Sequence, residues 1–272
     1  MTEQRIDLGG VGNARELGGY RIGDRRVRRG ALLRSAGLDR ATPEALEALQ
    51  SRYRVQTVVD LRMSAERSLL PDPVIPGAVN LHLPVIEMED MLADADPSLV
   101  ALYSDPNTDR MTLFNAVYES GVMNERLYVD FLLGERGRRA FRGFFGALLA
   151  LEEGRALLWH CTDGKDRTGC AAMLTLFALG ADRKTVLADY LLTNACNAQR
   201  LEALRRRVAP LGMPAEKVEA LLFMSGGVIE GYMTAAIDAL EREFGGVAGY
   251  LAQIGVGEEE TGALRRRLLI EA

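Results

Sequence analysis

The chain has few cysteines, and it lacks the long apolar runs of membrane and secreted proteins. Its 272 residues include only Cys161, Cys170 and Cys196, with no Cys-x-x-Cys spacing. An odd, widely spaced set argues against a disulfide framework and against a cysteine-based metal site. No apolar run approaches the roughly 18 residues that suggest a membrane span, and the N-terminal Met-Thr-Glu-Gln-Arg-Ile-Asp-Leu lacks a signal-peptide core. These absences predict a cytoplasmic protein without a transmembrane segment, although they leave signal-less secretion open.

Basic side chains are also fewer than acidic ones. The 33 Lys and Arg residues face 38 Asp and Glu residues, which gives a formal net charge of −5 and argues against a nucleic-acid partner. The cluster Arg25, Arg26, Arg28 and Arg29 is typical of a solvated hairpin face. Since 48% of the residues are hydrophobic, the chain can bury a substantial core, and one domain over residues 1–272 is expected.

Predicted strands and helices alternate along the chain. A hairpin is expected over 8–35, a helix after Thr42 and Pro43, and strands at 55–62 and 78–85. A helical insertion follows at about 87–150, then a strand from 155, a helix from Thr168 to Gly180, and C-terminal helices over 184–272 that include a last helix over 264–270. This order indicates an α/β fold with a mostly parallel central sheet flanked by helices.

The stretch 155–169 carries the chemistry. It reads Arg-Ala-Leu-Leu-Trp-His-Cys-Thr-Asp-Gly-Lys-Asp-Arg-Thr-Gly, an apolar strand followed by a polar loop over 160–168 that leads into a helix. A thiol below the first turn of a helix meets unpaired backbone N–H groups and the positive end of the helix dipole. With Lys165 and Arg167 in the same loop, Cys161 should hold more thiolate at neutral pH than a free cysteine, whose thiol has a pKa of about 8.5.

The loop has the dimensions of a phosphate cradle. Its backbone N–H groups can point inward as a nest, and the Arg167 fork matches two phosphate oxygens. Gly164 permits a tight turn close to the ligand. The predicted phosphate-binding residues are Thr162, Asp163, Gly164, Lys165, Asp166 and Arg167. Attack of the Cys161 thiolate on phosphorus would give a phosphocysteine that water hydrolyses.

A leaving alkoxide or phenoxide needs a proton, and Asp60 is the predicted donor. Asp60 ends the 55–62 strand, and parallel strands would bring it to the same sheet edge as Cys161. Thr168 is expected to donate its hydroxyl to the sulfur, and His160 to fix the loop through a hydrogen bond. The role of Asp166 stays open between catalysis and loop structure.

Plainer interpretations exist for each of these residues. Cys161 could be a buried structural thiol, Asp60 could pair with Arg62 or cap the next helix, and Lys165 could pair with Asp166. Two other functions also use a cysteine or an anion loop of this kind: a sulfurtransferase or arsenate reductase, and an inactive phosphate-binding adaptor.

Four motifs resemble one enzyme family. The run from His160 to Gly169 is similar to the signature of cysteine-dependent protein tyrosine phosphatases, in the Gly-Lys-Asp-Arg-Thr version of the atypical bacterial group typified by mycobacterial PtpB and listerial LipA. Matching motifs are Asn-Ala-Arg-Glu-Leu-Gly-Gly at 13–19, Asp-Leu-Arg at 60–62 with Glu66, and Asp-Tyr-Leu-Leu-Thr-Asn at 189–194. Together they extend over most of the chain.

The resemblance implies a phosphatase fold, with no metal and no cofactor. It implies activity on phosphotyrosine proteins, sometimes on phosphoserine or phosphothreonine, and on phosphoinositides, with inorganic phosphate as product and inhibitor. The aspartate matching Asp60 is the family's proposed general acid, and a lysine at the position of Lys165 adds charge for a polyphosphorylated headgroup. Members can carry a helical lid, for which the 87–150 insertion and the 195–224 segment are the candidates here.

Overall fold

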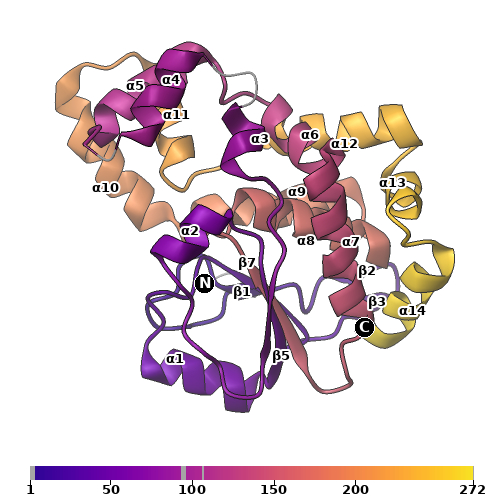
Figure 1. Ribbon diagram of the computed structural model, residues 1–272. Coiled ribbons are helices and arrows are strands. Elements are labelled where there is room, and N and C mark those ends of the chain that lie inside the picture. The colour runs from indigo at the N-terminus through magenta and orange to yellow at the C-terminus, as the bar shows by residue number, and fades with distance from the viewer. Residues whose placement is uncertain (1–3, 93–95, 106, 272) are drawn as a thin grey trace.

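A five-stranded sheet forms the centre of the computed structural model, which describes residues 4–92, 96–105 and 107–271 (Figure 1). Its strand order is β1-β4-β7-β5-β6. The strands are β1 (Arg15–Glu16), β4 (Leu32–Ser35), β5 (Val55–Asp60), β6 (Val79–His82) and β7 (Ala156–His160). All neighbours pair in parallel except β1 and β4. The prediction of a mostly parallel sheet flanked by helices is therefore confirmed.

Side chains of β7 alternate between two hydrophobic cores. Leu157 and Trp159 enter a larger core, while Ala156 and Leu158 enter a smaller one on the opposite face. Alternation follows from the two-residue period of a strand, and burial of both faces is typical of parallel sheets. The smaller core is covered by α1 (Pro43–Glu47) and the π-helical turn Ala48–Arg52. The larger core is covered by the helices of the insertion and of the C-terminal half.

The predicted helical insertion and C-terminal helices are present. The insertion contains α3 (Met88–Leu92), α4 (Pro97–Ser104), α5 (Arg110–Ser120), α6 (Arg126–Leu133) and α7 (Glu135–Leu149). After β7 come α8 (Asp166–Leu179), α9 (Arg183–Cys196), α10 (Ala198–Val208), a short 3-10 turn (Ala209–Leu211), α11 (Ala215–Met224), α12 (Glu230–Phe244), α13 (Val247–Gln253) and α14 (Glu258–Leu268). In Figure 1, α4, α5, α10 and α11 gather away from the sheet, and Phe114, Val208 and Leu221 pack together between α5, α10 and α11.

Helix ends follow their sequence signals closely. The Thr42 hydroxyl accepts a hydrogen bond from Ala45 N at 3.2 Å and caps α1. Gly180 ends α8 in the left-handed conformation, with φ of 99°. Asp182 then caps α9 by accepting from Thr185 N at 2.7 Å.

The predicted hairpin is joined by the C-terminus of the chain. Strands β2 (Arg21–Ile22), β3 (Arg25–Val27) and β8 (Leu269–Glu271) form a small antiparallel sheet. The prediction of a helix over 264–270 is wrong at its end, because the chain leaves α14 at Leu268 and pairs with β3. Arg25 and Arg26 are exposed on this sheet, as expected for a solvated face.

Among the described residues, no helix combines the length and the apolar character needed to cross a bilayer. This agrees with the absence of a predicted membrane span. The cytoplasmic location and the absence of a nucleic-acid partner stay predictions.

Candidate active site

The phosphate loop, residues 161–167, joins the end of β7 to the start of α8. Cys161 follows directly after the strand and is only 1% exposed. Helix α8 begins at Asp166 rather than at the predicted Thr168, so Arg167 is a residue of its first turn. The backbone N–H groups and the positive dipole end of α8 therefore begin five residues after Cys161, and their effect on the thiol stays a prediction.

Hydrogen bonds on the outside of the loop orient its peptide planes. Thr162 O accepts from Gly37 N at 3.1 Å. Gly164 O accepts from Asn13 Nδ2 at 2.8 Å and from Arg34 Nη2 at 3.0 Å. Because C=O and N–H point in opposite directions in a trans peptide, the N–H groups that follow these carbonyls face the inside of the loop. Within the part of the chain that the structure describes, the N–H groups of residues 162–165 donate no hydrogen bond, which leaves them available to an anion.

Gly164 is required by the neighbouring strand as well as by the turn. Its φ is +66°, in the region that favours glycine. A Cβ atom at this position would lie 2.4 Å from the carbonyl carbon and oxygen of Ser35, at the end of β4. The left-handed φ matches the predicted tight turn, and β4 leaves no room for a side chain at this position.

Glu66, on α2 (Ser64–Leu69), holds the Arg167 guanidinium. Its Oε1 accepts from Arg167 Nη2 at 2.9 Å and from Thr162 Oγ1 at 2.5 Å, and its Oε2 accepts from Arg167 Nη1. Burial opposes ionisation of this carboxyl, yet Arg167 and the Thr162 hydroxyl lower the pKa of Glu66 to about 2. Burial also opposes the charge on Arg167, and the Glu66 contact raises its pKa above the usual value.

Glu66 also contributes to the start of its own helix, because Oε2 accepts from Met63 N at 2.8 Å. The sequence shows Glu66 only as one residue of a resembling motif. Its double role depends on a contact between α2 and the phosphate loop, which sequence spacing does not reveal.

Asp60 lies at the predicted sheet edge, where it pairs in register with His160 on β7. Its carboxylate is bound by Arg62. Oδ1 accepts from Arg62 N at 3.0 Å and from Nε at 2.9 Å, and Oδ2 accepts from Nη2 at 2.8 Å. Asp60 is 3% exposed. The arrangement matches the plainer interpretation, a strand-end ion pair, and its role as an acid stays a prediction.

His160 is buried between the nucleophile and a carboxylate that sequence reasoning missed. His160 Nδ1 lies 3.2 Å from Cys161 O, and Nε2 lies 3.0 Å from Asp72 Oδ2. Asp72 comes from the proline-rich loop after α2. Burial opposes its ionisation, but His160 and Arg62 lower the pKa of Asp72.

Asp60, Asp72 and His160 are close enough together to suggest a metal site. However, Arg62 Nη2 lies 2.8 Å from an oxygen of each aspartate. The guanidinium thus already supplies the cation that these two carboxylates require.

Lys165 and Asp166 face the helices that cover the loop. Lys165 Nζ donates to Phe223 O, lies 3.4 Å from Gly227 O, and sits 4.2 Å from the centre of the Phe223 ring. It also approaches Asp166 Oδ2 at 3.5 Å. Asp166 Oδ1 accepts a hydrogen bond from the Tyr128 hydroxyl on α6. In this conformation the Lys165 ammonium is directed away from the inside of the loop, and its predicted contact with phosphate stays a prediction.

Both candidate lid segments contact the loop. The helical insertion does so through Tyr128, and the 195–224 segment does so through α10 and the end of α11. On α10, Arg200 Nη1 donates to Asp163 Oδ1 at 2.8 Å, and at the end of α11 Phe223 O accepts from Lys165 Nζ.

Thr168 presents a buried hydroxyl with no hydrogen-bond partner among residues 4–92, 96–105 and 107–271. Its carbonyl is held by Trp159 Nε1 at 3.1 Å. The free hydroxyl is compatible with the predicted donation to the sulfur. The other two cysteines have no such setting: Cys170 is buried in the core, where burial raises the pKa of its thiol, and Cys196 is partly buried on α9.

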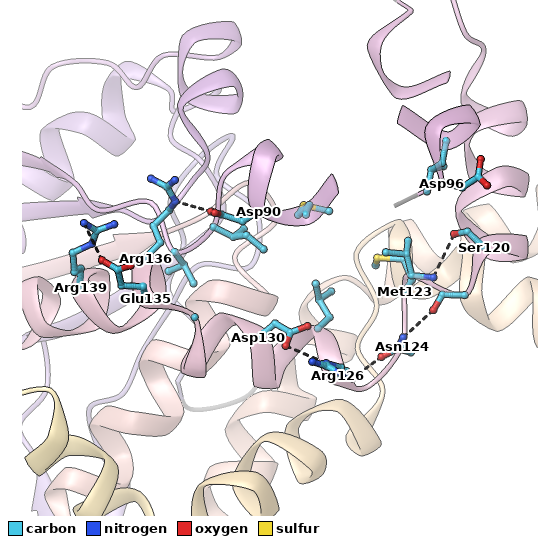
Figure 2. A pocket seen from close by; sticks show the side chains of 18 residues that line it. Asp90, Asp96, Ser120, Met123, Asn124, Arg126, Asp130, Glu135, Arg136 and Arg139 are labelled. Atoms are coloured by element: carbon cyan, nitrogen blue, oxygen red, sulfur yellow. Dashed lines mark hydrogen bonds and ion pairs between the residues drawn. The ribbon is translucent and has the colours of Figure 1, made fainter. Parts of the chain in front are cut away.

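A cleft of about 780 Å³ lies among the helices of the insertion and is lined by side chains of α3, α6 and α7 (Figure 2). Its charged side chains pair with one another. Arg136 Nε contacts Asp90 at 2.6 Å, Arg126 contacts Asp130 at 3.3 Å, and Arg139 contacts Glu135 at 3.5 Å. Six of the charged side chains in the cleft therefore neutralise one another in pairs, and Asp96 caps α4.

Comparison with known proteins gives a consistent set of relatives. Residues 6–270 match the model of the "Tyrosine phosphatase family". A Cupriavidus necator protein whose name provisionally assigns it as a tyrosine-protein phosphatase is 35% identical over 242 residues, covering 89% of this chain and 80% of the relative. The triple specificity protein phosphatase PtpB of Mycobacterium tuberculosis is 29% identical over 261 residues, covering 89% and 92%. A tyrosine-protein phosphatase of Nostoc commune is 28% identical over 239 residues, covering 88% and 74%.

Among solved structures, P. aeruginosa TpbA in complex with phosphotyrosine is matched with a TM-score of 0.32 and 16% identity, over 81% of this chain and 96% of that one.

Proposed function

Since this chain belongs to the tyrosine phosphatase family and is a protein-tyrosine phosphatase, we propose that it acts through a phosphocysteine formed on Cys161. The observation that carries the proposal is the phosphate loop itself. Free N–H groups face inward, Arg167 is fixed by Glu66, and the thiol lies at the end of β7. Family membership favours this function over the sulfurtransferase and arsenate reductase alternatives and over an inactive adaptor.

The reaction consists of two displacements at phosphorus. The Cys161 thiolate forms an S–P bond as the P–O bond to the substrate oxygen breaks, and the departing oxygen takes a proton. Inward N–H groups and the Arg167 guanidinium stabilise the charge on the transferring phosphoryl oxygens. Water then attacks phosphorus and gives a proton to the carboxylate that protonated the leaving group, the S–P bond breaks to restore the Cys161 thiolate, and inorganic phosphate leaves. The Thr168 hydroxyl is proposed to stabilise the thiolate as it departs.

Two carboxylates compete for the role of proton donor. Asp60 is the residue that the sequence predicts as the acid. Its carboxylate accepts three hydrogen bonds from Arg62, so it can donate a proton only after this ion pair separates. Asp166 lies within the loop, and its side chain is 19% exposed against 4% for Asp60. Asp166 accepts from the Tyr128 hydroxyl and lies 3.5 Å from Lys165 Nζ, so it is also held by donors, but its greater exposure makes it more accessible to a substrate oxygen.

We propose phosphotyrosine as the preferred substrate, with phosphoserine, phosphothreonine and phosphoinositides as poorer ones. A nucleophile that is 1% exposed favours a long aryl phosphate that can reach it. The two cations nearest the rim do not favour a polyphosphorylated headgroup, since Lys165 is bound to Phe223 O and Arg200 to Asp163. The name of the mycobacterial relative states triple specificity, which is why the poorer substrates belong in the test.

Phosphate release tests the proposal, with a phosphotyrosine peptide, a phosphoserine peptide and phosphoinositide vesicles as substrates. We expect wild type to act most rapidly on phosphotyrosine, and Cys161→Ser to lose activity on all three. Cys196→Ser is the matched control, because this thiol lies on α9 away from the loop interior, and it should retain wild-type rates. Full activity of Cys161→Ser would overturn the covalent mechanism. A higher rate on vesicles would overturn the substrate preference.

A further inference from the structure

Behind the phosphate loop lies a cluster of charged residues that the proposed mechanism does not use. Arg15 on β1 and Arg34 on β4 are both 0% exposed, and both bind Asp189 on α9. Arg15 Nε lies 3.2 Å from Asp189 Oδ1, and Arg34 Nη1 lies 2.6 Å from Asp189 Oδ2. We call Arg15 and Arg34 the buried arginine pair.

The cluster carries an excess of positive charge. Although burial opposes ionisation of Asp189, the two guanidinium groups keep its pKa below the usual value. Burial and the neighbouring Arg15 lower the pKa of Arg34 to about 10, so it remains charged at neutral pH. Tyr20, which donates to Asp189 Oδ1 at 3.2 Å, stays neutral because burial raises its pKa. Two cations thus share one anion, and an uncompensated buried charge is costly unless an anion lies nearby.

Arg34 is the member of the buried arginine pair that contacts the Gly164 carbonyl of the phosphate loop. Its Nη2 donates to Gly164 O at 3.0 Å. Its Nε is buried and has no hydrogen-bond acceptor in the described part of the chain. The charge of a Cys161 thiolate favours the protonated form of Arg34, and by reciprocity the Arg34 charge favours the thiolate. Among the described residues, Arg167 and Cys170 also interact electrostatically with this thiol, and His160 Nδ1 lies 3.2 Å from Cys161 O.

We propose that Arg34 is a positioning residue with two effects on the site. Its hydrogen bond fixes the Gly164 carbonyl outward, and the net positive charge of the buried arginine pair stabilises the Cys161 thiolate. The use of that thiolate in catalysis rests on the proposed function, whereas the charge coupling does not. A bound phosphate dianion would meet the same positive charge.

Two substitutions that each remove one charge should shift the pH at which the Cys161 thiolate forms in opposite directions. Arg34→Gln removes one buried cation, so the thiolate should form at higher pH, by about one pH unit, which is a tenfold change in the thiol equilibrium. Asp189→Asn removes the shared anion, so the thiolate should form at lower pH. Tyr20→Phe changes no charge and is the matched control, with an unchanged midpoint. The readout is the pH titration of thiolate ultraviolet absorbance, taken as the difference between each protein and its own Cys161→Ser counterpart.

Opposite shifts support the proposal, because a purely structural role would disturb the titration in the same direction in both variants. Equal shifts, or no shift in either, would overturn it. Circular dichroism checks the fold, and if Arg34→Gln does not fold, the sign of the Asp189→Asn shift decides. Failure of the proposed function would be seen separately, as phosphatase activity that survives in Cys161→Ser while the titration shifts remain.

Discussion

Replacing Glu66 by glutamine would remove one charge from the contact that fixes Arg167. The amide keeps the shape of the side chain, and its oxygen can still accept one hydrogen bond. In the native protein this carboxylate has a pKa of about 2 instead of 4.5, and the pair is largely buried, with side-chain exposures of 11% for Arg167 and 23% for Glu66. At 1.36 kcal/mol for each pH unit, the ionised form therefore contributes at most about 3 kcal/mol to the free energy of unfolding.

We expect Glu66→Gln to lower the free energy of unfolding at pH 7 by about 1–3 kcal/mol, measured by urea denaturation. Activity should fall by at least about tenfold, because the Arg167 guanidinium loses the carboxylate that holds it in position to bind phosphate. Glu89→Gln is the matched control: Glu89 pairs with Arg136 at 3.0 Å but is 76% exposed, so its loss should change stability by less than about 1 kcal/mol.

The stabilisation by Glu66 should depend on pH in a defined direction. Since the pKa of Glu66 is lower in the folded than in the unfolded protein, its stabilisation is complete above pH 4.5 and is lost as the pH falls toward 2. The stability difference between wild type and Glu66→Gln should shrink over that window. A difference that stays constant from pH 7 down to pH 3, or a Glu66→Gln variant as stable as Glu89→Gln, would refute the electrostatic account of this contact.

Three further substitutions test the geometry of the loop and the proton donor. Gly164→Ala should destabilise the protein by at least about 2 kcal/mol and reduce activity, because its Cβ would collide with Ser35. Gly146→Ala on α7 meets open space and should raise the stability in thermal unfolding by up to about 1 kcal/mol. Asp166→Asn should slow aryl phosphates with poor leaving groups more than those with good ones, if Asp166 is the acid. If Asp60→Asn shows that dependence and Asp166→Asn does not, the donor is Asp60.

The sequence was sufficient to predict the loop because its chemistry is local. The thiol, the glycine turn, the arginine and the following helix are contiguous, and strand parallelism brought Asp60 beside His160. Likewise, Thr42, Gly180 and Asp182 mark helix ends through hydrogen bonds to neighbouring residues, which is why their positions were predictable.

The supporting residues could not be predicted, because they act across long separations in sequence. Glu66 reaches Arg167 from α2, and Asp72 reaches His160 from an irregular loop. Arg34 lies within an apolar strand, where its guanidinium would be expected to be exposed. Its ion pair with Asp189 depends on the packing of α9 against β4, which the sequence does not reveal. The end of α14 was also mispredicted, since pairing of Leu269 with Val27 outweighs local helical propensity.

The most direct test of the account is to trap the covalent intermediate. Wild-type enzyme is mixed with a phosphotyrosine peptide that carries a radiolabelled phosphate, and the reaction is denatured within one turnover and digested. We predict label on the fragment that contains Cys161, lost on a chase with unlabelled substrate and absent from Cys161→Ser. Full turnover with no label on that fragment, or label on another residue, would contradict a phosphocysteine mechanism.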